Sequence, residues 1–194
     1  MMEDNSRARI VAETMKLFNY RGYKSVTMRE IANHLGISSR TLYNLFPSKE
    51  DIAEEVISLL SQNVNEGILQ VRNSKSDPVS KLRQVIYLVK NELIAINPLL
   101  IRDISLYVPN LNQRILNRRD EFVQLIEDYI KQGQAAGLIK KEINPELAAH
   151  TYIGMLRALI NTQNDDMHGY SKEEVFDFLI CIFFTGICEN HTSK

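Results

Sequence analysis

The chain has 194 residues, of which 44% are hydrophobic and 24% are charged, and its formal net charge is −1. These values are ordinary for a globular protein and give no overall basic excess that would indicate nucleic acid. The N-terminus lacks the apolar core of a signal peptide, and the most apolar run, residues 178–188, is too short and broken to span a membrane. We therefore expect a cytoplasmic protein with no membrane partner.

The charges are unevenly distributed along the chain. Residues 1–50 hold eight Lys or Arg and five Asp or Glu, a net of +3, which leaves −4 for residues 51–194. A mildly basic head suits a DNA-facing end, because phosphate contacts need only local charge. A chance fluctuation explains the difference in charge equally well, so only the sequence motifs can indicate whether this end binds DNA.

Helical periodicity recurs along the chain and no strand-like alternation persists, which predicts an all-α fold of about nine helices. In the first helix, one stripe is formed by Ile10, Thr14, Leu17 and Phe18, and Gly22 ends the helix. Ser48 caps a long fourth helix.

Prolines and capping residues indicate the later boundaries. The fourth helix runs to about Asn73, and Pro109 ends the sixth. An Asp or Asn before a proline begins three helices, over residues 78–96, 98–107 and 145–163.

Two further helices complete the count. A long helix runs from about Asn112 to Gly137, where glycine ends it. Ser171 and Glu174 have the spacing of a capping box, so we expect them to begin the last helix, which reaches about Glu189.

The segment between residues 27 and 46 predicts two short helices joined by a tight turn. Thr27 and Glu30 are spaced as a capping box, Gly36 stands where a left-handed residue ends the first helix, and Ser38 can cap the second. The apolar positions at helical spacing are Met28, Ile31, Ala32, Leu35, Leu42 and Phe46. The outward positions of the second helix are Ser39, Arg40, Thr41, Tyr43 and Asn44. This is a helix-turn-helix whose second helix presents a polar face sized for the major groove.

The residues of this segment resemble a known family signature. The pattern T-M-x-E-I-A-x-x-L-G-I-S-x-x-T-L-Y-x-x-F-x-S-K-E over residues 27–50 is similar to the N-terminal signature of the TetR (tetracycline-repressor-type) family of transcription regulators. A second phrase, G-L-I-x-x-x-I-N-P-E-x-x-A over residues 137–149, resembles a turn that recurs in the same family.

The resemblance implies a function and a domain organisation. It implies a helix-turn-helix DNA-binding domain over residues 1–47 and a helical ligand-binding and dimerisation domain over residues 48–194. The expected protein is a homodimeric repressor that binds an inverted-repeat DNA operator and is released by an unknown small-molecule effector. The alternative is a helical dimeric small-molecule-binding or interaction protein with a weakened DNA-binding head.

Arg40 is the main candidate for reading a base, because its guanidinium can bind O6 and N7 of a guanine. The other interpretations of Arg40 are that it contacts a phosphate or only solvent. Asn44 could read an adenine, and Leu45 replaces a histidine or tyrosine of the family, so one phosphate clamp is absent. The expected DNA contacts are Thr27, Ser38, Ser39, Arg40, Thr41, Tyr43, Asn44 and Lys49. Arg7 and Arg9 would be either solvated charges or contacts to the DNA backbone.

The resemblance also implies an effector pocket and a dimer interface. The residues expected to line the pocket are Tyr87, Asn91, Arg102, Tyr107, Phe122, Ile126, Tyr152 and Met155. The same pattern equally fits an ordinary helical core with a polar surface. Dimer contacts are expected from Gly154, Ala158, Phe178, Leu179, Ile182, Phe183 and Gly186. These faces could pair with a second copy in a four-helix bundle, or cover the core of their own chain.

Catalytic chemistry is not indicated by the sequence. There is no nucleophile–base–acid set, no cofactor loop and no convincing metal-ligand spacing, so we expect no enzyme activity, no cofactor and no metal site. Cys181 and Cys188 stand seven residues apart on one expected helix, roughly 10 Å in rise, which is too far for a disulfide within the chain.

Overall fold

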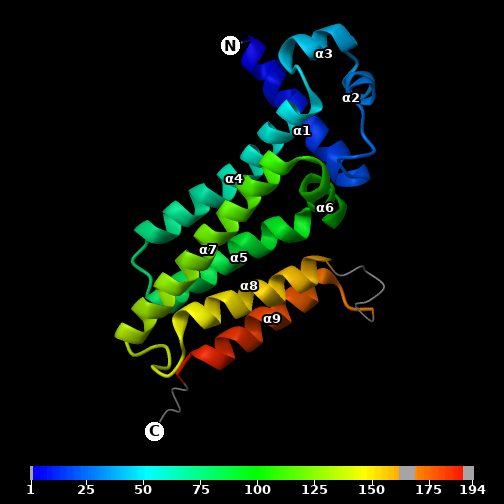
Figure 1. Ribbon diagram of the computed structural model, residues 1–194. Helices are drawn as coiled ribbons and strands as arrows, with labels where there is room; N and C mark the ends of the chain where they lie inside the picture. The colour runs from blue at the N-terminus through cyan, green and yellow to red at the C-terminus, as the bar shows by residue number, and fades with distance from the viewer. Residues whose placement is uncertain (1, 162–168, 190–194) are drawn as a thin grey trace. The chain divides into compact units, whose positions relative to one another are not determined.

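The computed structural model describes residues 2–161 and 169–189, and the regular structure of this part of the chain is helical (Figure 1). It contains nine helices and no named strand, which confirms the predicted all-α fold. The helices are α1 Met2–Arg21, α2 Met28–Leu35, α3 Ser39–Leu45, α4 Lys49–Asn73, α5 Pro78–Ala95, α6 Pro98–Tyr107, α7 Pro109–Ala135, α8 Pro145–Asn161 and α9 Lys172–Ile187. Among the described residues, no single helix is long and apolar enough to span a membrane; only α5 and α6 taken together reach that length and hydropathy.

Most helices begin and end close to the residues that the sequence indicates. Gly22 ends α1 with a φ of 79°, in the left-handed region that favours glycine. α7 differs, because it begins at Pro109 rather than near Asn112. Val108 alone separates it from α6, and proline fits the first helical position, where its missing N–H costs nothing. The predicted continuation of α8 to residue 163 lies outside the described residues.

Contacts between residues divide the chain into two compact units. Unit 1 comprises Met1–Asn63 and Ala95–Ile115, and unit 2 comprises Val64–Ile94 and Leu116–Lys194. α4 and α7 therefore each begin in unit 1 and end in unit 2. The boundary between domains that the sequence predicts at Pro47 and Ser48 remains a prediction.

Unit 1 has a single apolar core to which six helices contribute. Phe18 of α1, Ile31 of α2 and Leu42 of α3 are completely buried in it. α6 packs against α1, and its Leu100 and Ile104 join the same core. The N-terminal head is thus supported by residues about eighty positions further along the chain.

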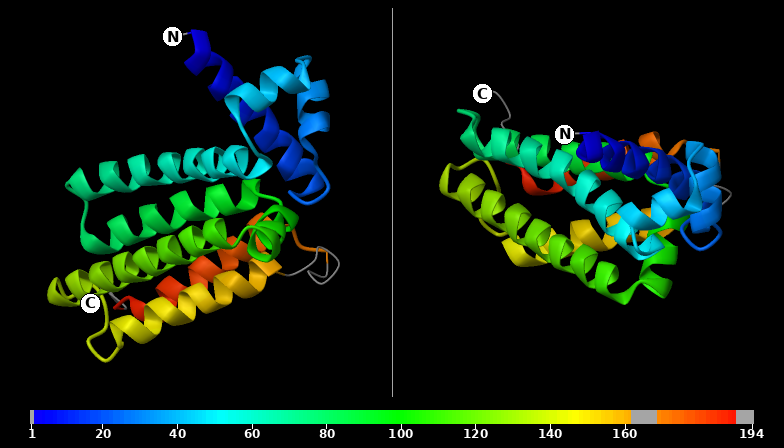
Figure 2. Two further views of the ribbon diagram at one scale, coloured as in Figure 1. Left: turned by 45° about the horizontal axis from the view of Figure 1, so that its top comes forward. Right: turned by 90° about the horizontal axis from the view of Figure 1, so that it is seen from above.

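Unit 2 buries the facing sides of α5, α7, α8 and α9. α8 and α9 lie side by side and antiparallel, as Figures 1 and 2 show. Tyr152 of α8 and Phe183 of α9 are both buried, with their ring centroids 4.8 Å apart. A backbone bridge between Ile139 and Cys188 ties the loop after α7 to the end of α9.

Candidate nucleic-acid interface

α2 and α3 form a helix-turn-helix in which the predicted caps are present. Thr27 accepts a hydrogen bond from the Glu30 N–H at 3.3 Å, and the Glu30 carboxylate accepts one from the Thr27 N–H at 2.8 Å. Gly36 ends α2 with a φ of 68°, and its N–H bonds to carbonyls of the last turn of α2. Ser38 then accepts from the Thr41 N–H at 3.0 Å and caps α3.

α3 exposes nearly all of its side chains. Leu42 is its one fully buried residue, and Tyr43 is 50% exposed. The side chains of Arg40, Tyr43 and Asn44 have no hydrogen-bond partner among the residues that the structure describes, so their donors and acceptors are available to a ligand. Ser39 is exposed beside them. The outward face of α3 is therefore polar, and the side chains of Arg40, Tyr43 and Asn44 on it have unused hydrogen-bonding groups.

Three other expected contact residues form local hydrogen bonds at the starts of α2 and α3. The Thr27 hydroxyl donates to Glu30 Oε2 at 2.8 Å, and this bond is the main cause that holds the pKa of Glu30 below its ordinary value. Ser38 Oγ and Thr41 Oγ1 lie 2.8 Å apart, so one of these hydroxyls donates to the other. All three residues are exposed, and a phosphate contact from these hydroxyls would have to share or replace those bonds.

Lys49 has a structural role that the sequence does not reveal. Its ammonium donates to the carbonyls of Tyr23 at 3.0 Å and Val26 at 2.9 Å, and it lies 4.0 Å from the centroid of the Tyr23 ring. Burial lowers the pKa of Lys49, although the charge of neighbouring Glu50 acts against this shift. Tyr23 also donates to Glu50 at 2.8 Å, and its own burial raises the pKa of its hydroxyl. Lys49 therefore joins the start of α4 to the turn after α1, and its phosphate contact remains a prediction.

The expected pocket residues are divided between the two units. Arg102 and Tyr107 belong to unit 1, where both are exposed and the Lys24 ammonium lies 4.7 Å from the Tyr107 ring centroid. The other six belong to unit 2: buried Ile126 and Tyr152, half-buried Tyr87, Phe122 and Met155, and exposed Asn91. The structure therefore does not gather all eight in one compact unit, because α6 packs against α1.

The expected dimer residues also fall into two groups. Leu179 and Phe183 are 4% and 6% exposed and pack in the core of unit 2, and their part in a dimer interface remains a prediction. The other five expected dimer residues are exposed on α8 and α9: Gly154, Ala158, Phe178, Ile182 and Gly186. Helical periodicity alone cannot tell which of two apolar stripes on α9 is covered by α8.

Comparisons with known proteins agree with this geometry. The family model for "Bacterial regulatory proteins, tetR family" matches residues 10–56, and the model for "Tetracyclin repressor-like, C-terminal domain" matches residues 75–161. The first of these ranges contains the whole helix-turn-helix.

Relatives of full length support the same assignment. The HTH-type transcriptional regulator YvaF of Bacillus subtilis is 25% identical over 92% of this chain and 94% of its own. The HTH-type transcriptional repressor NicS of Pseudomonas putida is 23% identical over 87% of this chain and 80% of its own. The crystal structure of a transcriptional regulator from Saccharomonospora viridis in complex with choline has a TM-score of 0.82 and 21% identity, and covers 96% of this chain and 100% of that one. The chain belongs to the TetR family of DNA-binding transcription regulators.

Proposed function

We propose that this regulator is a repressor whose homodimer binds an inverted-repeat operator and is released by a small effector. The observation that carries the DNA-binding part is α3, a seven-residue helix with one fully buried side chain and a polar outward face. A dimer would aim two such helices at neighbouring turns of one duplex, so the operator would have two-fold symmetry. The regulator would then act in the cytoplasm, where its operator is.

Within this proposal the residues of α3 have different roles. Arg40 binds a guanine edge, Tyr43 donates its hydroxyl to a phosphate, and Asn44 reads an adenine or faces the groove without specificity. Ser39 lies in the first turn, where base edges are met. Thr27 adds a phosphate contact at the N-terminus of α2, where the helix dipole and backbone amides favour anions.

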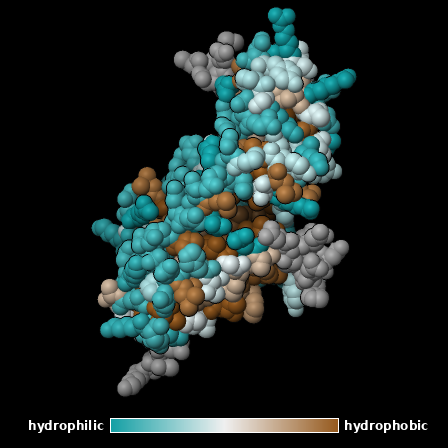
Figure 3. All heavy atoms as spheres, in the orientation of Figure 1, coloured by the Kyte–Doolittle hydropathy of each residue, from teal (hydrophilic) through white to brown (hydrophobic). Residues whose placement is uncertain are grey.

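The homodimer is supported by an exposed apolar face on α8 and α9. Leu147, Phe178 and Ile182 are 65%, 67% and 45% exposed, and Figure 3 shows hydrophobic surface in the region of these two helices. A Cβ added at Gly154 or Gly186 would meet nothing within 4 Å, so a second backbone could approach closely at both positions. Such a face on a soluble protein is typical of an interface, and a two-fold copy would make a four-helix bundle.

The effector would bind in unit 2, where Tyr87, Phe122 and Met155 lie half-buried against the core. The similar regulator from Saccharomonospora viridis was crystallised with choline, which supports a small molecule as the ligand. To release DNA, the effector must bind the DNA-incompetent arrangement of the dimer more tightly than the competent one, since equal affinity shifts nothing.

Selection from random DNA duplexes tests the proposal. We expect wild-type protein to enrich a two-fold-symmetric site, with two proteins bound per site by native mass spectrometry. Arg40→Ala should relax the preference at one base pair by roughly 1–3 kcal/mol while leaving non-specific binding nearly unchanged. Lys75→Ala, in the exposed loop between α4 and α5, is a control that removes one positive charge elsewhere.

The alternative function is a dimeric ligand-binding or interaction protein with a weakened DNA-binding head. It is favoured by Lys49, whose ammonium is engaged by two carbonyls, and by Leu45, which has no side-chain donor. This alternative predicts a dimer that enriches no duplex at any salt concentration, and that result would overturn the proposed repressor.

A further inference from the structure

Arg7 and Arg9 of α1 are partly or largely exposed, yet each donates a hydrogen bond to a carbonyl of the helix-turn-helix. Arg7 Nη1 donates to the carbonyl of Leu45 at 2.5 Å, and Arg9 Nη2 donates to the carbonyl of Leu35 at 3.2 Å. Leu35 is the last residue of α2 and Leu45 is the last residue of α3. The final carbonyls of a helix have no partner within the helix, and its C-terminus favours a cation. Each arginine thus binds the C-terminal end of one helix of the motif.

Arg7 makes two further contacts with the same guanidinium. Its Nη2 donates to Glu55 of α4, and its Cζ lies 4.1 Å from the centroid of the Phe46 ring, just after α3. The side chains of Arg7 and Glu55 are 38% and 41% exposed, so the ion pair alone is weak. The geometry depends on the planar fork, which serves a carbonyl, a carboxylate and a ring together, and lysine cannot reproduce it.

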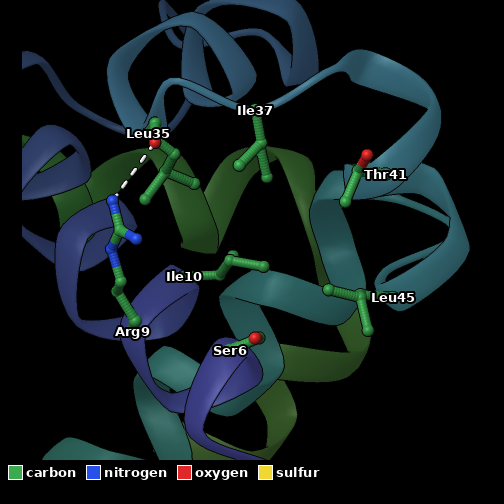
Figure 4. Close-up of a pocket in the computed structure, with 7 residues that line it drawn as sticks. All are labelled: Ser6, Arg9, Ile10, Leu35, Ile37, Thr41 and Leu45. Atoms are coloured by element: carbon green, nitrogen blue, oxygen red, sulfur yellow. Dashed lines mark hydrogen bonds between the residues drawn. The ribbon is translucent and has the colours of Figure 1, made fainter. Parts of the chain in front are cut away.

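A pocket that is open to solvent is lined by both residues to which the arginines are attached, Leu35 and Leu45. Figure 4 shows it between α1 and the α2–α3 motif, with Ile10, Ile37 and Leu45 lining it and Arg9 reaching Leu35 at one side. Its volume is about 360 Å³. Leu42 is the one fully buried residue of α3, and Leu45 packs partly against the core of unit 1. The polar attachments therefore add to the apolar packing that orients α3.

We infer that Arg7 and Arg9 are positioning residues that hold α3 and α2 against α1 by their C-terminal carbonyls. Arg7 carries the larger share, because it also joins α3 to Glu55 of α4. The recognition helix is then presented at a fixed angle, and Arg7 affects DNA binding by holding α3 rather than by binding phosphate. The inference rests on the proposed function only in its DNA-binding consequence, since the attachment itself exists in the free protein.

Arg7→Lys, Arg7→Ala and Glu55→Gln test the role of Arg7 against the selected operator and a random duplex, each over a range of salt concentrations. We expect Arg7→Lys and Arg7→Ala both to lower operator affinity roughly tenfold or more, comparable to losing one base contact. Binding to the random duplex and the slope of log K against log salt should change little. Glu55→Gln should also lower the ratio of operator to random affinity, although it makes the protein less negative.

A phosphate contact would give a different pattern. Arg7→Lys would then keep operator affinity, while Arg7→Ala would weaken both duplexes alike and reduce the salt slope by about one. That pattern overturns the inference. A melting temperature for each variant identifies general unfolding, and if Arg7→Ala does not fold, Arg7→Lys and Glu55→Gln carry the test.

Hydrogen exchange of the free protein tests the attachment without DNA. We expect faster amide exchange in α3 of Arg7→Lys and Glu55→Gln, with exchange in α8 unchanged. Unchanged protection of α3 in both variants would overturn the inference, even if wild-type protein selects an operator. If wild-type protein selects no operator, the proposed function fails, and exchange in α3 still decides the attachment.

Discussion

The carboxylate of Asp103 on α6 accepts a hydrogen bond of 2.7 Å from the backbone N–H of Lys24, in the turn between α1 and α2. Asn19 of α1 binds the residues just before α6. Its side-chain amide donates to the carbonyl of Ala95 at 2.8 Å and accepts from the Asn97 N–H at 2.5 Å. α6 is therefore joined to the head by specific polar contacts as well as by apolar packing. One of these contacts, from Lys24 to Asp103, holds the turn after α1 itself.

Gly22 and Asp103 should be coupled energetically. A Cβ on Gly22 would lie 2.8 Å from Asp103 Oδ2, and Gly22 also has a φ of +79°. Gly36 has a φ of +68° but nothing within 4 Å of its Cβ position, so Gly36→Ala measures the left-handed conformation alone, roughly 1–2 kcal/mol. We expect Gly22→Ala to cost more than Gly36→Ala in urea unfolding.

In an Asp103→Ala background, the cost of Gly22→Ala should fall to that of Gly36→Ala, because the contact is gone. Asp103→Ala alone should cost about 1–2 kcal/mol through the lost charge-assisted hydrogen bond. Strict additivity of Gly22→Ala and Asp103→Ala would contradict the contact.

Thr14→Val should stabilise unit 1. Thr14 is completely buried in α1, and its Oγ1 has no hydrogen-bond partner among the described residues. Valine has nearly the same shape without the hydroxyl, so it removes an uncompensated polar group that costs about 1–3 kcal/mol. Thr14→Ser is the control, because it keeps the hydroxyl and loses the methyl group, and it should destabilise. A lower urea midpoint for Thr14→Val would contradict the burial of an unpaired hydroxyl.

Glu92→Gln should stabilise the protein increasingly as the pH rises. Burial raises the pKa of Glu92 in the folded protein above its ordinary value of 4.5, and the charge of Arg118 only partly opposes this. The folded state therefore binds a proton more tightly than the unfolded state, and that stabilisation is lost as the pH rises through the folded pKa. Melting temperatures of Glu92→Gln and wild type should differ more at pH 7.5 than at pH 4.

Asp77→Asn provides a control of opposite sign. Asp77 accepts from the Val79 and Ser80 N–H groups at 3.0 Å, and its bonds to Ser80 are the main cause that lowers the pKa of its carboxyl. Its contribution is present above the ordinary pKa and is lost as the pH falls, so Asp77→Asn should destabilise at pH 7.5 and little at low pH. The same pH trend for Asp77→Asn and Glu92→Gln would contradict one of the two assignments, and the sign of the trend would show which.

Phe178→Glu should convert the proposed dimer to a monomer. Phe178 is 67% exposed on the apolar face of α8 and α9, where a second copy would bury a charge without a partner. Leu69→Glu on α4 is the matched control, since Leu69 is 58% exposed outside this face and should leave the dimer intact. Light scattering after gel filtration measures the mass. A Phe178→Glu protein that remains dimeric would place the interface elsewhere.

Local signals in the sequence predicted the helices well, because capping is a short-range interaction. The capping boxes at Thr27 and Ser171 and the left-handed glycine at Gly36 are all present. Pro109 was misleading, since proline is found both after one helix and at the start of the next. Val108 is the C-cap of α6, so no loop separates α6 from α7.

Long-range contacts could not be predicted in the same way. The sequence identifies Arg7 and Lys49 as basic residues near the motif, yet their partners Leu45 and Val26 are backbone carbonyls, which carry no sequence signal. Lys90 is buried, with 4% of its surface exposed. Its ammonium donates to the carboxylate of Asp177, 87 positions away, at 2.5 Å. Residue types therefore indicated where charged side chains lie along the chain, but not which of them form hydrogen bonds within the protein.

The division of labour within α3 has a consequence for specificity. Leu42 and the caps at either end keep the helix folded, while Ser39, Arg40 and Asn44 add nothing to the core. In the proposed complex these three side chains face the operator, so mutations there would change its base preference while leaving the fold of α3 intact.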